Sequence, residues 1–309
     1  MSGAATDPRR IVVIVNAGAG TGHDEALLAR VRELFDAAGA PAEVRAAHGA
    51  QIVDQVEAAR AERPAIIVAG GGDGTVSAVA AALVDSDIAF GVLPLGTLNH
   101  FAKDLGIPLD LEAAVEQVVR GRATRVDVGE VNGRIFVNNS SLGLYPDIVR
   151  DRERQQHRLG RGKWLALVWA SLAALRRYPF LRVRLHIDGS ERERRTPFVF
   201  IGNNEYRVEG FAIGEREHLD RGRLSLYLAH RPGRARLLLL VLRAVSGRLK
   251  QARDFEALLA RDFVVETGHR LLRVANDGEV FTMTTPLHYR IRPASLTVMR
   301  SPDEPPAET

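Results

Sequence analysis

The sequence predicts a two-part fold, in which a doubly wound α/β domain precedes a β-sandwich domain. Up to residue 120, short apolar strand patterns alternate with amphipathic helix patterns, which is typical of a parallel sheet covered by helices. From residue 123 onward, many short strand patterns are separated by turn residues, which is typical of a sandwich. We therefore expect an α/β domain over residues 1–130, completed by residues 293–300, and a sandwich over residues 131–292. The proline- and glutamate-rich tail, residues 301–309, is expected to be disordered.

The composition excludes several classes of protein. The 309 residues include no cysteine, so disulfides, thiol nucleophiles and cysteine-bound metal sites are excluded. Residues 1–9 are polar and lack the apolar segment of a secretory signal. The longest apolar runs, residues 164–175 and 237–245, are shorter than the ~20 residues that span a bilayer. We expect a soluble protein of the cytoplasm.

The first strand pattern, residues 10–16, is a continuous β-branched run, as in a parallel strand that is buried on both faces. A glycine loop at residues 17–22 and a helix pattern follow it. The loop lacks the Gly-Lys-Ser/Thr ending of a Walker A motif, and its glycine spacing differs from the dinucleotide fingerprint. A strand at residues 43–46 and a helix at residues 50–61 continue the alternation.

The central motif is the loop of residues 70–75, Gly-Gly-Gly-Asp-Gly-Thr, between a buried strand (residues 65–69) and a helix (residues 76–84). Glycines let the backbone approach a ligand closely, and the unpaired N–H groups at a helix start favour an anion. The loop therefore favours a phosphate ligand, with Asp73 beside an accompanying cation. A glycine-rich turn without a ligand is the alternative.

A second loop follows the strand at residues 89–93 and has the sequence Pro-Leu-Gly-Thr-Leu-Asn-His-Phe-Ala over residues 94–102. A short helix is expected from residue 98, and a helix at residues 111–120 completes the α/β alternation. Ligands of doubly wound sheets bind beyond the carboxyl ends of the strands. All three glycine-containing loops are expected at that edge.

The second half of the chain is predicted to be mostly strands. Asn132-Gly133 predicts a two-residue hairpin, and so, taken alone, does the turn Asn276-Asp277-Gly278-Glu279. Strands are expected at residues 125–131, 135–140, 181–187, 198–202, 224–229, 263–267, 271–275, 280–284 and 287–292, and helices within residues 144–178 and 234–249.

The motif Gly-Gly-Asp-Gly-Thr, followed by Pro-Leu-Gly-Thr-x-Asn-x-Phe-Ala-x-x-Leu-Gly-Ile-Pro, resembles the diacylglycerol kinase catalytic family, which includes bacterial lipid kinases and sphingosine and ceramide kinases. The resemblance extends from about residue 10 to about residue 299, and the Asp-Gly-Glu of residues 277–279 belongs to it. It implies a nucleotide-binding α/β domain like that of NAD kinases and lipid kinases, followed by a lipid-substrate β-sandwich. The implied activity is transfer of the γ-phosphate of ATP, with Mg²⁺, to a hydroxyl of diacylglycerol or a related lipid.

The resemblance also implies roles for individual residues. The implied nucleotide-binding residues are Asn16, Gly18, Gly20, Gly70, Gly71, Gly72, Asp73, Gly74, Thr75, Thr97, Asn99 and Asp127. For the chemistry it implies Asp277, Glu279 and Asp73; we expect Asp277 to be the base and the other two to face the metal, although the sequence does not decide which carboxylate takes the proton. A further metal ligand is implied at Asp220, where Arg221 stands in place of a second aspartate.

The arginine content predicts the partners. Nearly all basic residues are arginines, and they gather at residues 150–163, 176–184 and 231–253. Arginine suits phosphate recognition, and an anionic membrane surface fits these clusters, whereas no nucleic-acid-binding motif is present. We therefore expect a lipid substrate at an anionic membrane, with the protein peripheral to the inner face, and no nucleic acid partner. A homodimer is compatible with this picture.

Two alternative functions remain. An NAD kinase shares Gly-Gly-Asp-Gly and a similar two-domain plan, but the stretch at residues 96–102 belongs to the lipid kinases. A catalytically silent lipid- or nucleotide-binding protein is suggested by Ala17 and Thr21, where the family usually has proline and a basic residue. The three carboxylates of the implied active site are retained, which argues against a catalytically silent protein.

Overall fold

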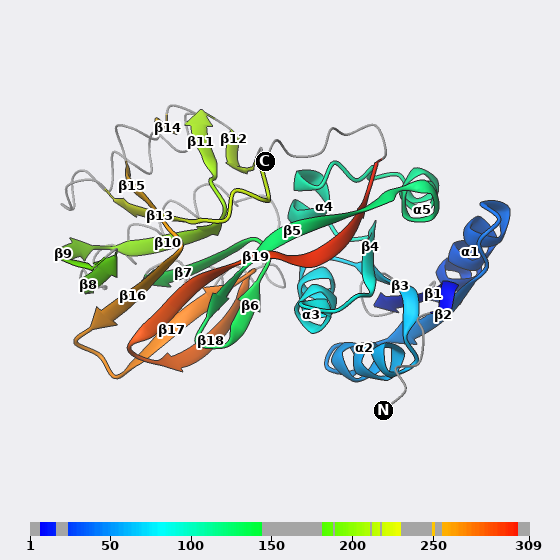
Figure 1. Cartoon of the computed structure of the whole chain (residues 1–309), viewed down its shortest axis with the longest axis horizontal. Coiled ribbons are helices and arrows are strands. Elements are labelled where there is room, and N and C mark those ends of the chain that lie inside the picture. The colour runs from blue at the N-terminus through cyan, green and yellow to red at the C-terminus, as the bar shows by residue number, and fades with distance from the viewer. Residues whose placement is uncertain are drawn as a thin grey trace, which may run out of the picture. The chain divides into compact units, whose positions relative to one another are not determined.

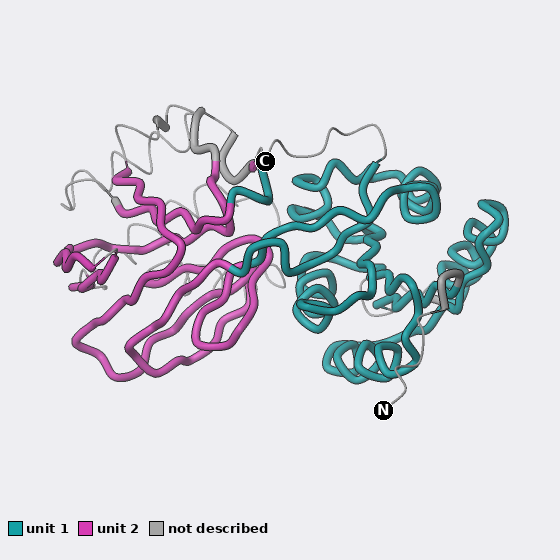
Figure 2. Tube along the Cα trace, viewed as in Figure 1, with its two compact units in different colours: residues 1–128, 218–221, 292–309 teal, residues 129–217, 222–291 magenta. Residues whose placement is uncertain are grey.

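A computed structural model describes residues 7–16, 24–143, 181–187, 189–210, 212–216, 218–229, 249–250 and 255–301. The chain divides into two compact units (Figure 2). Unit 1 comprises residues 1–128, 218–221 and 292–309, and unit 2 comprises residues 129–217 and 222–291. Outside the described residues lie Gly18 and Gly20, nearly all of the two helix regions expected at 144–178 and 234–249, most of the arginine clusters, and the tail from residue 302.

Unit 1 is a parallel sheet with helices, as the sequence predicts (Figure 1). Its strand order is β2-β1-β3-β4, all neighbours are parallel, and the C-terminal part of β19 pairs in parallel with β4. The elements are β1 (Asp7–Asn16), α1 (Asp24–Ala37), β2 (Ala42–Ala47), α2 (Gln51–Ala61), β3 (Pro64–Gly71), α3 (Asp73–Leu83), β4 (Ala89–Pro94), α4 (His100–Asp104), α5 (Leu111–Arg120) and parts of β5 (Arg122–Val131) and β19 (Leu287–Arg300).

The core of unit 1 lies between the sheet and its helices. Ile14, Ile67 and Phe90, on three neighbouring strands, expose none of their surface. Val79 of α3 and Val56 of α2 are equally buried. Strands with apolar residues on both faces need helices on both faces, which explains the regular alternation along the chain.

The carboxyl ends of the central strands are aligned. Val15 of β1 is in register with Gly70 of β3, and Gly71 is in register with Pro94 of β4. The glycine loop at residues 70–74 and the loop that follows Pro94 therefore begin at the same edge of the sheet.

Unit 2 is a β-sandwich, as the sequence predicts. One sheet has the order β15-β13-β10-β7-β17-β18, and the first part of β19 continues with β16, β8 and β9 in the other. The elements are β6 (Arg134–Phe136), β7 (Asn139–Gly143), β8 (Leu181–Ile187), β9 (Ser190–Thr196), β10 (Phe198–Asn203), β11 (Arg207–Gly210), β12 (Ala212–Glu215), β13 (Leu224–Ala229), β14 (Leu249–Lys250), β15 (Phe255–Ala260), β16 (Asp262–Thr267), β17 (Leu271–Asn276) and β18 (Glu279–Thr284).

The sandwich core is formed by apolar side chains of both sheets. Leu142 and Val274 from one sheet join Phe263 and Tyr289 from the other in a single buried cluster. The Phe263 and Tyr289 rings stack with centroids 5.1 Å apart. The alternation of apolar and polar residues along these short strands is explained by one face packed on this core.

Two hairpins have the turn geometry that their sequences predict. Asn132 and Gly133, between β5 and β6, have φ angles of 47° and 84°. Asp277 and Gly278, between β17 and β18, have φ angles of 48° and 89°. Positive φ at both central residues is the type I′ turn, which Asn-Gly and Asp-Gly favour.

Among the described residues, no helix is both long enough and apolar enough to cross a membrane.

Candidate active site

The glycine loop at the end of β3 needs its glycines for close packing. A Cβ atom on Gly71 would lie 2.7 Å from the Thr75 side chain, and one on Gly70 would lie 3.2 Å from Val15. Gly72 is the N-cap of α3, and as a glycine it has no side chain that could cap the helix start. The first N–H groups of α3 therefore remain available to an anion.

Asp73 connects this loop to the second one. Its two carboxylate oxygens accept hydrogen bonds from the backbone N–H groups of His100 (2.7 Å) and Asn99 (3.1 Å). These groups begin the short helix α4, so Asp73 of one motif caps the helix of the other.

Asn99 holds the second loop in shape. It is 7% exposed and has a φ of 52°, in the left-handed region that asparagine tolerates. Its Oδ1 accepts from the N–H of Gly96 at 3.0 Å, and its Nδ2 donates to the carbonyls of Gly96 (2.8 Å) and Pro94 (3.2 Å). One side chain thus holds the loop in this shape through three hydrogen bonds.

The end of β1 joins the same group of loops. Asn16 Nδ2 donates to Thr75 Oγ1 at 3.0 Å. Thr75 is buried, whereas Gly74 and Thr97 are exposed at the same edge. Of the predicted nucleotide-binding residues that the structure describes, all except Asp127 belong to these linked loops.

Asp127 lies in β5 and contacts other segments of unit 1. Its backbone N–H donates to the carbonyl of Leu219 at 2.7 Å, and its Oδ1 accepts from the N–H of Ala294 at 2.9 Å. The carboxylate is buried, with 2% of the residue exposed. The Leu219 contact explains why residues 218–221, with Asp220 among them, belong to unit 1 although their neighbours belong to unit 2.

Asp277 has its carboxylate oxygens occupied by backbone donors. They accept from the N–H groups of Val137 (2.8 Å), Asn138 (2.8 Å) and Asn139 (3.0 Å), all in unit 2. The Asp277 N–H in turn donates to the Asn139 carbonyl at 2.9 Å. These N–H groups therefore hold the Asp277 carboxylate against the backbone of residues 137–139.

Arg216 binds the same segment from its other side, and sequence reasoning missed this residue. It is 5% exposed and donates to the carbonyl of Val137 at 2.7 Å and to Asn138 Oδ1 at 2.8 Å. Asn203 Nδ2 donates to the same Val137 carbonyl at 2.9 Å. The only signal in the sequence is the pair of Asn-Asn dipeptides, at 138–139 and 203–204, beside short strands.

Glu279 follows the turn and begins β18. Its side chain is exposed, and it stands opposite Asn276 in the β17–β18 register. Of the two carboxylate residues in this hairpin, Glu279 is exposed and Asp277 is half-buried.

The predicted metal ligands are Asp73, Glu279 and Asp220. Among the described residues, no group of three or more histidine, aspartate or glutamate side chains lies close enough to hold a metal ion. Asp73 belongs to unit 1 and Glu279 to unit 2. Carboxylate oxygens of this kind suit Mg²⁺, which commonly takes one or two protein carboxylates and completes its shell with phosphate oxygens and water.

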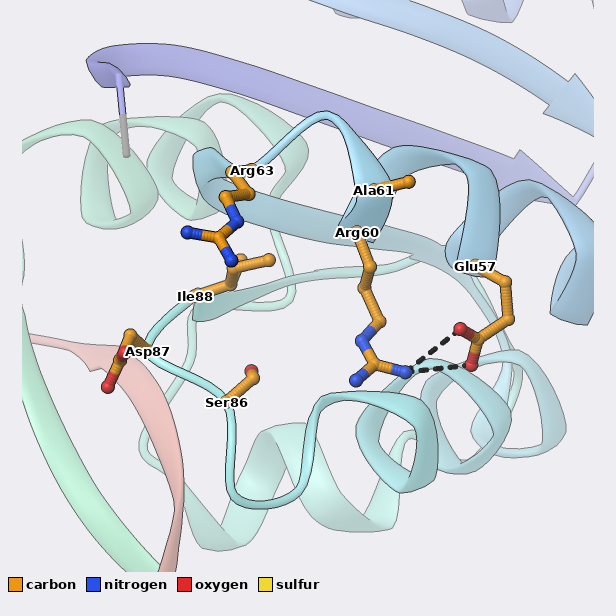
Figure 3. Close-up of a pocket in the computed structure, with 7 residues that line it drawn as sticks. All are labelled: Glu57, Arg60, Ala61, Arg63, Ser86, Asp87 and Ile88. Atoms are coloured by element: carbon orange, nitrogen blue, oxygen red, sulfur yellow. Dashed lines mark hydrogen bonds and ion pairs between the residues drawn. The ribbon is translucent and has the colours of Figure 1, made fainter. Parts of the chain in front are cut away.

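A separate pocket of about 540 Å³ lies at the amino ends of β3 and β4 (Figure 3). It is lined by Glu57, Arg60, Ala61, Arg63, Ser86, Asp87 and Ile88. Arg60 is paired with Glu57 of the same helix at 2.9 Å. Because the glycine loops lie at the opposite ends of these strands, this pocket is not part of the candidate active site.

Two family models match the chain. Residues 10–131 match the diacylglycerol kinase catalytic domain, and residues 147–300 match the YegS C-terminal NAD kinase beta sandwich-like domain. The chain belongs to the diacylglycerol kinase catalytic family. The resemblance inferred from the two loop motifs is confirmed.

Two bacterial proteins are similar to parts of this chain. An uncharacterised Synechocystis protein is 28% identical over 242 residues, which are 77% of this chain and 55% of that protein. A probable lipid kinase YegS-like protein of Yersinia pestis is 42% identical over 92 residues, 28% of this chain and 31% of that protein. The chain thus spans about half of the first relative and about a third of the second.

Solved structures support the same fold. A putative diacylglycerol kinase from Bacillus anthracis superposes with a TM-score of 0.76 at 22% identity, covering 96% of this chain and 99% of that one. A second diacylglycerol kinase structure from that organism gives a TM-score of 0.70 at 20% identity, with the same coverage. At this identity the likeness shows the fold of both domains, which the family models assign independently.

Proposed function

We propose that this member of the family is an ATP-dependent kinase that transfers the γ-phosphate to a hydroxyl of diacylglycerol or a related lipid. The observation that supports it most is the linkage of three strand-end loops in unit 1 by Asp73, Asn99 and Asn16. Loops held by their own side chains leave backbone N–H groups directed at a ligand, which is how helix starts and glycine loops bind phosphates.

The proposed nucleotide site consists of Asn16, Gly70, Gly71, Gly72, Gly74, Thr75, Thr97 and Asn99, with Asp73 at its centre. ATP suits this donor set because its phosphates carry several negative charges, which the start of α3 favours. Asp127 does not belong to these loops. Its buried carboxylate accepts the Ala294 N–H and so stabilises the interior of unit 1. We propose that its effect on the nucleotide is indirect.

Mg²⁺, when bound with ATP, would neutralise charge on the phosphates as the γ-phosphoryl group leaves. Asp73 is the proposed protein ligand, and Glu279, which the resemblance also implies as a ligand, is instead assigned to the proton of the hydroxyl. Each oxygen of Asp73 accepts one N–H group, which leaves further lone pairs for a cation. Asp220 is the weaker candidate because Arg221 follows it.

The proposed reaction needs one proton acceptor. The lipid hydroxyl oxygen forms a bond to the γ-phosphorus, the bond to the β–γ bridging oxygen breaks, and ADP leaves. Glu279 is the proposed acceptor of the hydroxyl proton, because its side chain is exposed, whereas Asp277 and Asp73 are half-buried and position backbone segments. In this proposal, Asp277 and Arg216 position the backbone of residues 137–139.

An enzyme that phosphorylates a lipid has to act at a membrane surface. We propose that the protein is peripheral to the inner face of an anionic membrane, with no nucleic acid partner. This proposal is supported by the arginine-rich composition of residues 150–163, 176–184 and 231–253. A homodimer is compatible with it.

The deciding experiment incubates the purified protein with labelled ATP, Mg²⁺ and a panel of acceptors: diacylglycerol, sphingosine, ceramide, phosphatidylglycerol and NAD. Label in one or more lipids, but not in NAD, is the expected result. Label in NAD alone would support the NAD kinase alternative. No transfer to any acceptor, with ATP binding intact, would support a silent nucleotide-binding protein.

A further inference from the structure

One buried amide next to the candidate active site is left without a partner. Asn276 exposes 4% of its surface, and no donor or acceptor among the described residues reaches either its Oδ1 or its Nδ2. Buried polar groups are nearly always hydrogen-bonded, so an unpaired amide in a folded protein needs an explanation.

Packing of the sandwich does not explain an asparagine at this position. Side chains alternate along a strand, so Leu272, Val274 and Asn276 share one face of β17. Val274 belongs to the sandwich core and Leu272 packs against it. An apolar residue at position 276 would continue this face without burying an unpaired amide.

Asn276 instead belongs to a polar row across three strands. Its register partners are Ser140 on β7 and Glu279 on β18, and opposite residues of an antiparallel pair point to the same face. The Ser140 hydroxyl lies 3.0 Å from the hydroxyl of buried Tyr289. The row therefore runs from a buried hydroxyl pair through the unpaired amide to the exposed carboxylate of Glu279.

We propose that Asn276 determines acceptor specificity: its amide binds an oxygen on the carbon adjacent to the hydroxyl that is phosphorylated. This inference rests on the proposed function, in which Glu279 takes the proton from that hydroxyl. Opposite residues of a strand pair have Cβ atoms about 4.5–5.5 Å apart, so a carboxylate and an amide there can contact neighbouring oxygens of one ligand. The acceptor class is a lipid with an ester, amide or second hydroxyl next to its free hydroxyl.

The test compares two acceptors in the same mixed micelles at saturating ATP: a diacylglycerol, and a long-chain primary alcohol that contains no other oxygen. The variants are Asn276→Leu and the smaller Asn276→Val, in case leucine disturbs packing. Ser141→Ala is the matched control, because it also removes a buried unpartnered polar atom, from the opposite face of β7.

We expect both Asn276 variants to lose about tenfold in kcat/KM for the diacylglycerol, as for one lost hydrogen bond, with the alcohol changed less than about twofold. Their melting temperatures should equal or exceed that of the wild type, because an unpaired amide has been removed. Ser141→Ala should keep the wild-type ratio of the two acceptors.

Three results would overturn the proposal. An unchanged acceptor ratio in both Asn276 variants would show that the amide does not contact the acceptor. An equal loss for both acceptors together with a lower melting temperature would show that the amide is structural, for instance through an internal water. A wild-type protein that phosphorylates neither of these acceptors nor any lipid of the panel above would refute the proposed function, and this inference with it.

Discussion

A Cβ atom added to Gly96 would lie 2.4 Å from the Cα atom of Gly72, so the two glycine loops touch backbone to backbone. The contact is one-sided, because a Cβ atom on Gly72 would meet the Cα atom of Gly96 at an ordinary 3.4 Å. The two glycines therefore differ in what they tolerate, and this difference can be measured.

Gly96→Ala should destabilise the protein by about 1–3 kcal/mol, as overpacked sites do, and should weaken ATP binding because the loops must separate. Gly72→Ala is the control and should melt close to the wild type. Gly72→Val should melt cooperatively as well, yet lose ATP affinity by calorimetry because a branched side chain occupies the approach to the loop. Equal melting temperatures for the two alanine variants would contradict the close approach.

Asp73→Asn should destabilise the protein, although asparagine has nearly the same shape as aspartate. An amide has one acceptor oxygen, so it cannot accept both the His100 and the Asn99 N–H, and its own NH₂ would face a donor. We expect a loss of about 1–2 kcal/mol, weaker ATP binding, and partial recovery of activity with excess magnesium.

Asp110→Asn is the matched control for this variant. Asp110 caps α5 by accepting a single N–H, from Ala113 at 3.0 Å, which an amide oxygen can also accept. Thermal unfolding should separate the two variants clearly. If they destabilise the protein equally, the two-donor role of Asp73 is incorrect.

The hairpin carboxylates should separate stability from chemistry. Asp277→Asn should lose at least about 2 kcal/mol of stability, because several hydrogen bonds to a charged acceptor are disturbed. Glu279→Gln should change stability by less than about 0.5 kcal/mol, as expected for an exposed position, and reduce kcat by about 10²–10⁴-fold. The opposite pattern, with a normal kcat in Glu279→Gln and a stable but inactive Asp277→Asn, would return the role of base to Asp277.

An ion-pair network of β1, β2 and the end of α2 should make stability depend on pH. Hydrogen bonding to Arg45 lowers the pKa of Glu62, and hydrogen bonding to Arg10 lowers the pKa of Glu43. A carboxylate with a lowered folded pKa stabilises the fold above its ordinary pKa of 4.5, and this stabilisation is lost as the pH falls through the folded value.

Glu62→Gln should therefore melt below the wild type at neutral pH, and the gap should close as the pH falls through the lowered pKa of Glu62, where the wild-type carboxylate is also protonated. Salt should narrow the gap at neutral pH, because the Arg45–Glu62 pair is partly exposed. Glu33→Gln is the control, since the pair of Glu33 with Arg30 is longer, at 3.6 Å, and more exposed. A gap that persists at acid pH would show that packing, not charge, is responsible.

The arginine clusters should make lipid phosphorylation depend on surface charge. At a fixed mole fraction of lipid substrate, activity should rise with the anionic lipid content of vesicles and fall with salt, since exposed charges are screened within about 8–10 Å at physiological ionic strength. Equal rates on neutral and anionic vesicles would show that these clusters are solvated surface.

Local features of the sequence were sufficient for much of the fold. The β-branched run of β1 and the Asn132-Gly133 turn depend on the residues themselves and their immediate neighbours, so they could be predicted. The family was predictable because its two loop motifs are continuous in sequence and adjacent along the chain.

The contacts of the candidate site could not be predicted in the same way. Asp277 is about 140 positions away from the N–H groups of Val137 and Asn138 that it accepts, and a carboxylate in a turn is equally compatible with a base or an anchor. The buried position of Arg216 and the unpaired amide of Asn276 depend on which strands lie side by side. No local pattern contains that information.

The sharing of β19 between the units has a consequence for biosynthesis. Residues 287–290 of this strand pair with β16 in unit 2, while Val298 pairs with β4 in unit 1. During translation β4 therefore lacks its neighbour β19 until every strand of the sandwich has been synthesised. Domains usually fold one after another as they leave the ribosome, but here the first domain can complete its sheet only after the second has been synthesised. Until then β4 presents an unpaired edge, of the kind that promotes aggregation, so the nascent chain is most vulnerable in the interval before its last strand appears.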